Sequence, residues 1–116
     1  MGLIGDPFKK EWGPTHPGLH LAPYADCYRC PYKMEYPACG LFCLDFVRKI
    51  IEKNTTGSLA AIIVEPMQGT AGNIIPPPEF LPGLADIARE NDALLIDDEM
   101  ITGFGRTGEM LSLIHI

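Results

Sequence analysis

The sequence has no apolar run near the roughly 20 residues that a membrane-spanning helix needs. Positive charge is scarce as well, since nine Lys and Arg residues stand against 15 Asp and Glu and the formal net charge is -6 at pH 7. Nucleic acids and anionic membranes bind clustered Lys and Arg, so we expect neither as a partner. Residues 1–6 lack a basic stretch followed by an apolar one. We therefore expect no secretory signal and a cytoplasmic location.

What the chain does contain is typical of one small globular unit. It has 116 residues, of which 47% are hydrophobic and 21% are charged. Residues 1 to about 40 are rich in Pro, Gly, Tyr and Cys and show neither a helical nor a strand period. We expect this stretch to be an irregular segment that lies over the rest of the molecule.

A helix is predicted from Leu41 to Lys53. Its apolar side chains, among them Leu44, Val47 and Ile50, recur at the helical spacing and form one face. Asn54 is a plausible end for the helix.

The next 40 residues predict a strand, a helix and a second strand. Residues 59–64 form a continuous apolar run, as expected of a strand buried on both faces of a parallel sheet. Pro66 ends this strand, and residues 67–77 form a loop. A helix follows from about 78 to 90, and residues 93–96 form the second strand. The pattern indicates an α/β fold with a right-handed βαβ unit and a mainly parallel sheet.

Both predicted strands end in acidic residues. Glu65 follows the first, and Asp97, Asp98 and Glu99 follow the second. Parallel strands place their carboxyl ends at one edge, where open α/β sheets bind ligands. Because neighbouring residues of a strand point to opposite faces, only one of Asp97 and Asp98 can face a given ligand. A solvated acidic turn without a ligand is the alternative.

Two motifs at this edge resemble those of one enzyme family. Residues 98–108 read Asp-Glu-Met-Ile-Thr-Gly-Phe-Gly-Arg-Thr-Gly, and residues 65–69 read Glu-Pro-Met-Gln-Gly. The glycine pattern lacks the Gly-Lys-Ser/Thr ending of a nucleotide-binding loop. The first motif resembles the signature of class III aminotransferases, and the second resembles their Glu-Pro-x-Gln-Gly loop. The resemblance implies part of the large domain of a pyridoxal 5'-phosphate (PLP) enzyme of fold type I.

The resemblance also implies roles for single residues. Asp98 would face the pyridine nitrogen of PLP from a rigid, largely desolvated position, with Ile101 beside the ring hydroxyl and Gln68 near the ring. Glu65 would tether its loop, although a buried Glu whose hydrogen bonds are satisfied elsewhere is an equal alternative. Glu99 would be structural and hold the glycine-rich loop.

The implied reaction is the PLP-dependent transfer of an amino group from an amine or ω-amino acid to an oxo acid, by a homodimer. A racemase, an aminomutase or a decarboxylase of the same fold type is the alternative. Subgroups acting on 4-aminobutyrate or ornithine often carry an acidic residue in place of Thr70 and Gln in place of Ile101. These two differences weaken any transfer of their substrate preference to this chain.

The resemblance covers about residues 5–110, so we expect residues 1–110 to be part of a PLP-binding large domain. The lysine that would bind the cofactor lies further downstream in the family, and no lysine follows Lys53 here. We therefore expect no catalytic residue in this chain and no transaminase activity from it alone. Residues 111–116 look like the translation of a sequencing adapter and are expected to have no function.

The four cysteines follow the spacing Cys27-x2-Cys30-x8-Cys39-x3-Cys43. On spacing alone they could form a tetrahedral zinc site, which would make the chain a small zinc-binding interaction module. A similar Pro-Tyr-x-x-Cys-Tyr-x-Cys-Pro segment occurs in many class III members, and that resemblance implies no metal. A reducing compartment favours free thiols. We expect them to be small, buried, reduced side chains with a packing role.

Overall fold

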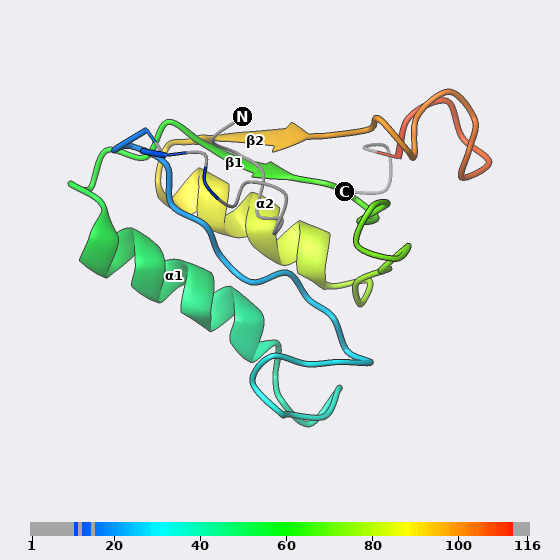
Figure 1. Cartoon of the computed structure of the whole chain (residues 1–116), viewed down its shortest axis with the longest axis horizontal. Coiled ribbons are helices and arrows are strands. Elements are labelled where there is room, and N and C mark those ends of the chain that lie inside the picture. The colour runs from blue at the N-terminus through cyan, green and yellow to red at the C-terminus, as the bar shows by residue number, and fades with distance from the viewer. Residues whose placement is uncertain (1–10, 12, 15, 113–116) are drawn as a thin grey trace.

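The computed structural model describes residues 11, 13–14 and 16–112 of the chain (Figure 1). Its elements are α1 (Phe42–Asn54), β1 (Ala61–Val64), α2 (Phe80–Glu90) and β2 (Leu94–Asp97). The α/β class and the βαβ unit predicted from the sequence are confirmed. Neither helix is long and apolar enough to cross a membrane. Residues 113–116 of the expected non-native tail lie outside the described residues.

The two strands pair in parallel, from Ala61 opposite Leu94 to Val64 opposite Asp97. β1 starts two residues later than the sequence predicts. The reason lies in its partner, because Ala93 still belongs to the turn that ends α2 and donates its N–H to Ala88 O at 2.9 Å. The segment after α2 is extended and available for pairing only from Leu94 onward.

Both helices pack on the same side of the sheet, as Figure 1 shows. The apolar face of α2 forms the centre of the core, where Phe80, Leu84 and Ile87 are at most 3% exposed. α1 packs against α2 with Leu44 and Val47, as its periodicity predicts. The helices approach closely at Gly83, where an added Cβ would collide with Cδ1 of Leu44.

The other face of the sheet is uncovered in the part of the chain that the structure describes. Leu94, Ile63 and Ile96 are 68%, 44% and 42% exposed. The prediction of strands buried on both faces is therefore wrong for this chain. The strands are exposed on one face because both helices cover the other face, whereas apolar residues of the strands point to both faces of the sheet.

Residues 16–40 contain turns and bends but neither helix nor strand, as predicted. Figure 1 shows this segment running along the helical side of the molecule. Ala25 is 4% exposed and Tyr24 packs beside it, so the segment contributes to the core.

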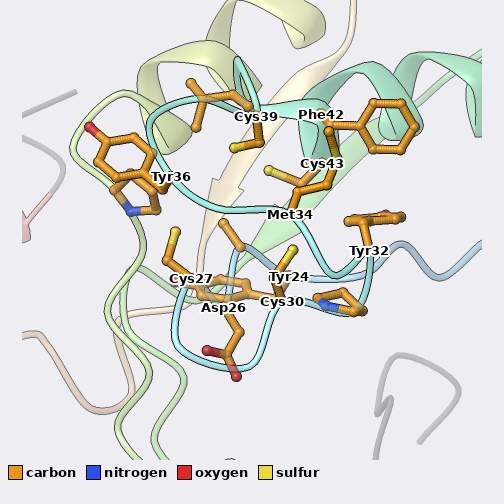
Figure 2. A pocket seen from close by; sticks show the side chains of 14 residues that line it. Tyr24, Asp26, Cys27, Cys30, Tyr32, Met34, Tyr36, Cys39, Phe42 and Cys43 are labelled. Carbon is orange, nitrogen blue, oxygen red and sulfur yellow. The ribbon is translucent and has the colours of Figure 1, made fainter.

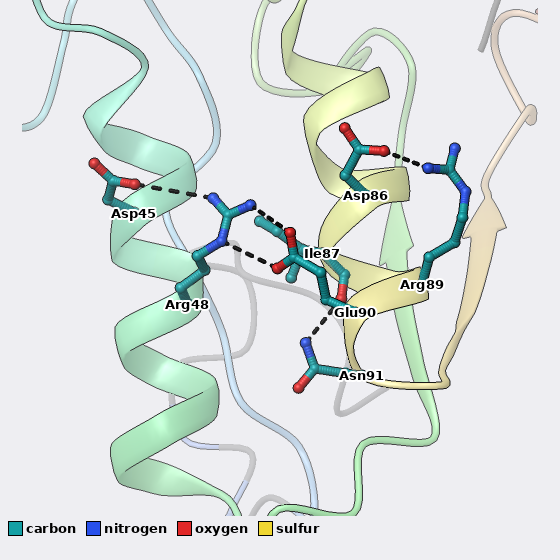
Figure 3. A network of polar contacts seen from close by, with 7 residues as sticks. All are labelled: Asp45, Arg48, Asp86, Ile87, Arg89, Glu90 and Asn91. Carbon is teal, nitrogen blue, oxygen red and sulfur yellow. Dashed lines mark hydrogen bonds and ion pairs between the residues drawn. The ribbon is translucent and has the colours of Figure 1, made fainter.

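Polar contacts join the exposed surfaces of the helices (Figure 3). Arg48 on α1 donates to the carboxylate of Glu90 on α2 at 3.1 and 3.3 Å, and Asp45 lies 3.9 Å from the same guanidinium. Asn91 closes α2 by donating its side-chain N–H to Ile87 O at 2.8 Å. Exposed ion pairs of this kind contribute at most about 1 kcal/mol. The core, rather than this network, holds the helices together.

Candidate cofactor site

The two acidic motifs meet at the carboxyl edge of the sheet. Figure 1 shows the loop after β1 and the loop after β2 leaving the same end of the strands. A Cβ built on Gly69 would lie 2.7 Å from Cγ1 of Ile101, so the two loops are in contact there. The shared edge expected from the sequence is confirmed.

Glu65 and Gln68 shape the first loop. Oε2 of Glu65 accepts the N–H of Gly69 at 3.1 Å, which closes the loop over four residues. Gln68 and Ile74 exchange backbone hydrogen bonds, both of 3.0 Å, in an antiparallel bridge. Glu65 thus makes the kind of contact that a tether requires.

Tyr24 holds the same loop from outside and was missed by sequence reasoning. Its hydroxyl lies 3.0 Å from the carbonyl oxygens of both Glu65 and Pro66, and its ring packs edge-on against Phe80 with centroids 5.2 Å apart. Burial raises the pKa of this hydroxyl, and the nearby carboxylates of Glu65 and Asp97 raise it further. The hydroxyl therefore stays a donor. It belongs to a segment without periodicity, so no sequence pattern signals the contact.

The neighbouring carboxylates Asp97 and Asp98 have different surroundings, as strand alternation requires. Asp97 is half-buried, with Oδ2 3.4 Å from Oγ of Ser112 and Oδ1 buried without a hydrogen-bond partner among the described residues. Burial, with the charges of Glu99 and Asp98 adding to it, raises the pKa of Asp97 to about 6. Asp98 is exposed, and its Oδ1 accepts the N–H of Met100 at 3.1 Å.

Glu99 connects the two ends of the glycine-rich loop. Its Oε2 accepts the hydroxyl of Thr102 at 3.1 Å and the N–H of Ser112 at 2.8 Å. Thr102 is 1% exposed, so this contact is fixed in place. Between these points the backbone turns back through Gly105 and Gly108, whose φ angles of 81° and 102° favour glycine.

Comparison with known proteins identifies the family. The sequence model of the class-III aminotransferases matches residues 1–116. The chain belongs to the class III aminotransferase family.

Individual relatives span several activities. The chain is 36% identical to a leucine/methionine racemase of Thermococcus litoralis over 84% of its length, and 37% identical to a 4-aminobutyrate aminotransferase of Mycobacterium tuberculosis over 94%. It matches the PLP-bound structure of an amine transaminase from an uncultivated Pseudomonas species with a TM-score of 0.78, at 36% identity over 87% of the chain. The chain spans only 22%, 25% and 23% of these three proteins.

Class III aminotransferases use PLP. The carboxyl edge of the sheet in this chain offers one of the groups that would bind this cofactor, the carboxylate of Asp98. The N–H of Met100 orients the exposed Asp98 carboxylate, and nothing else in the described residues bonds to it. A carboxylate so placed can accept a hydrogen bond from a protonated pyridine nitrogen. The prediction that Asp98 is largely desolvated is wrong for this chain, because Asp98 lies on the same uncovered sheet face as Ile96.

Of the other predicted residues, Gln68 is half-buried and Ile101 is 40% exposed. Ile101 lies against Gly69, the residue after Gln68, and Asp98 follows β2 at the same edge of the sheet. The structure therefore brings the predicted cofactor residues into one region.

The cysteines of this aminotransferase chain depart from expectation. All four are free, but none is buried, since Cys27 is exposed and the other three are half-buried. The prediction that the thiols are buried is wrong, because all four line an open pocket, but the half-buried Cys43 does pack against the core. In the described residues no group of three or more Cys, His, Asp or Glu side chains could hold a metal ion. The zinc-module alternative therefore has no structural support.

Proposed function

We propose that the protein to which this chain belongs transfers an amino group from an amine or ω-amino acid to an oxo acid, using PLP. The observation that carries the proposal is the contact between the two family motifs at one sheet edge, with Asp98 open beside them. Membership of the class III family and the similarity to an amine transaminase support it.

In this proposal each motif residue has one task. Asp98 holds the proton on the pyridine nitrogen, and PLP, when bound, supplies an electron sink for the carbanion that forms at the substrate. Gln68 and Ile101 would line the edge of the bound ring. Glu65 keeps its loop in place through the hydrogen bond to Gly69, and Glu99 does so through the hydrogen bond to Thr102.

The isolated 116-residue chain is proposed to be inactive, because no lysine follows Lys53 to form the covalent link to PLP. For the complete protein we propose a homodimer in the cytoplasm, as the family resemblance and the composition suggest.

A second candidate is a PLP-dependent racemase. The identity of 36% to a leucine/methionine racemase favours it, since the same ring-binding residues would serve both reactions. The two candidates differ in whether the amino group leaves the substrate.

The test uses the complete protein that contains these residues, purified with PLP. We expect an ω-amine and pyruvate to yield alanine and the corresponding aldehyde or ketone. Conversion of L-leucine into D-leucine without an oxo-acid acceptor would favour the racemase instead. A protein that retains no PLP and performs neither reaction would refute both candidates.

A further inference from the structure

All four cysteines line a single pocket, shown in Figure 2. Cys27 and Cys30 lie on one turn, Cys39 precedes α1 and Cys43 lies in its first turn. The other walls of the pocket are largely aromatic or apolar, from residues that include Tyr24, Tyr32, Met34, Tyr36, Phe42 and Pro77. Of the four thiols, core packing accounts only for that of Cys43, and the proposed PLP site includes none of them.

The four thiols differ in their access to solvent. Cys27 is exposed, whereas Cys30, Cys39 and Cys43 are half-buried. Burial raises the pKa of the Cys27 and Cys43 thiols, and Cys39 raises both further. No Lys or Arg is among the described residues that line the pocket, so no cation stabilises a thiolate there. The Cys27 and Cys43 thiols therefore lose their protons less readily than free thiols do.

The turn that carries Cys27 is fixed by hydrogen bonds. Oδ1 of Asp26 accepts the N–H groups of Tyr28 at 3.0 Å and Arg29 at 2.9 Å, which fixes the turn. Figure 2 shows the Cys27 sulfur at the Tyr36 end of the turn, below the sulfurs of Cys39 and Cys43, and the Cys30 sulfur at the other end, on the side of Tyr32. Cys27 thus combines access from solvent with a half-buried thiol across the pocket.

We propose that Cys27 and Cys39 form an oxidative modification site that closes to a disulfide by reaction with glutathione disulfide. The Cys27 thiolate attacks one sulfur of glutathione disulfide, which forms a mixed disulfide and releases one glutathione thiolate. The Cys39 thiolate then attacks the Cys27 sulfur and releases the second. Two protein thiols lose two electrons, and glutathione disulfide is reduced to two glutathione molecules that take up the two protons.

The pocket is connected to the loop at the sheet edge. Tyr24 lines the pocket and donates to the carbonyls of Glu65 and Pro66, and Tyr36 bonds to the Glu79 carboxylate at 3.0 and 3.1 Å. A Cys27–Cys39 disulfide would hold this segment against the start of α1. It would thereby restrain the contacts of Tyr24 and slow amide exchange at Gly69. The site does not depend on the proposed transaminase activity.

The test is incubation of the 116-residue chain in a glutathione redox buffer, followed by non-reducing digestion and mass spectrometry. We expect a Cys27–Cys39 crosslinked peptide, two hydrogens lighter than the sum of its parts, as the main product. Cys39→Ser is expected to stop at the mixed disulfide on Cys27, whereas the matched control Cys30→Ser still forms the crosslink. Because thiolate is the attacking species, the rate is expected to rise about tenfold per pH unit below the thiol pKa.

The same reaction in urea shows whether the fold selects the pair. In an unfolded chain the shortest loops close most easily, so Cys27–Cys30 and Cys39–Cys43 are expected to dominate there. A native pattern identical to the urea pattern would overturn the proposal. So would a native chain that gives mainly Cys27–Cys30, or only a glutathione adduct on Cys27.

Discussion

Tyr24 is the residue on which the geometry of the first loop depends most. Its hydroxyl hydrogen-bonds to the carbonyl oxygens of Glu65 and Pro66, which lie 41 and 42 residues further along the chain. Partly buried carbonyls need partners, and no helix or strand supplies them at this corner. The side chain therefore links an irregular segment to the carboxyl edge of the sheet.

Replacing Tyr24 by Phe removes this hydroxyl while keeping the ring against Phe80. We expect a loss of about 1 to 2 kcal/mol in the free energy of unfolding, because hydrogen bonds are lost and the carbonyls remain partly buried. Urea unfolding measures it, with Tyr28→Phe as the matched control, since Tyr28 is 91% exposed. Equal stabilities of the two variants would show that the Tyr24 hydroxyl has no structural role.

Asp97 makes the stability of the chain depend on pH in an unusual direction for a carboxyl group. Its pKa in the folded chain is about 6, above the ordinary 3.8. The folded state therefore binds more protons than the unfolded state between these values, and the contribution of Asp97 to stability falls as the pH rises through them. We expect Asp97→Asn to gain stability relative to the natural chain on going from about pH 4 to about pH 7. Urea unfolding at both pH values checks this, and an unchanged difference at both would contradict the pKa shift.

At the scale of elements, the contact of α1 with α2 depends on Gly83. Alanine is a better helix former than glycine by about 1 kcal/mol, so helix propensity alone predicts that Gly83→Ala stabilises α2. The collision of its Cβ with Leu44 opposes this, and overpacking of this kind costs about 1 to 3 kcal/mol. We expect net destabilisation in the natural chain and stabilisation in a Leu44→Ala background. A double-mutant cycle by urea unfolding measures the coupling, and additive effects would show that the helices do not touch at this point.

The sequence predicts the elements well because the helices show a helical period and the strands are short apolar runs. The predicted helix 41–53 is observed as Phe42–Asn54, and both strands are found in the expected order. The shared acidic edge follows from the parallel connection alone. The contact of Tyr24, the uncovered sheet face and the common pocket of the cysteines could not be predicted. The Tyr24 contact and the common pocket arise where a segment without periodicity meets distant parts of the chain. The sheet face is uncovered because both helices lie on the other face, which no local pattern signals.

At the scale of the whole molecule, the described chain has a core on one side and an apolar sheet face on the other. Ile63, Leu94 and Ile96 are exposed there, and Phe104 at 92% exposure lies on the glycine-rich loop. Two strands with an uncovered apolar face are marginally stable, and large exposed apolar patches promote association. The small share of each relative that the chain spans is consistent with such a surface.

We therefore expect the isolated 116-residue chain to have a free energy of unfolding below about 5 kcal/mol and to self-associate. Urea unfolding and analytical ultracentrifugation measure the two properties. The double change Ile63→Lys and Ile96→Lys is expected to reduce association, whereas Lys in place of the exposed Ala60 is a control without this effect. A stable monomer would show that the exposed face is tolerated in water.

The most direct test of the proposed site compares two Asp-to-Asn changes in the complete PLP-loaded protein. Asp98→Asn is expected to lower kcat/KM for amino transfer at least about a hundredfold, because the charge next to the pyridine nitrogen is lost. Asp92→Asn, in the exposed turn before β2, is the matched control and is expected to keep kcat/KM within about twofold. Equal activities of the two variants would contradict the assignment of Asp98 to the cofactor.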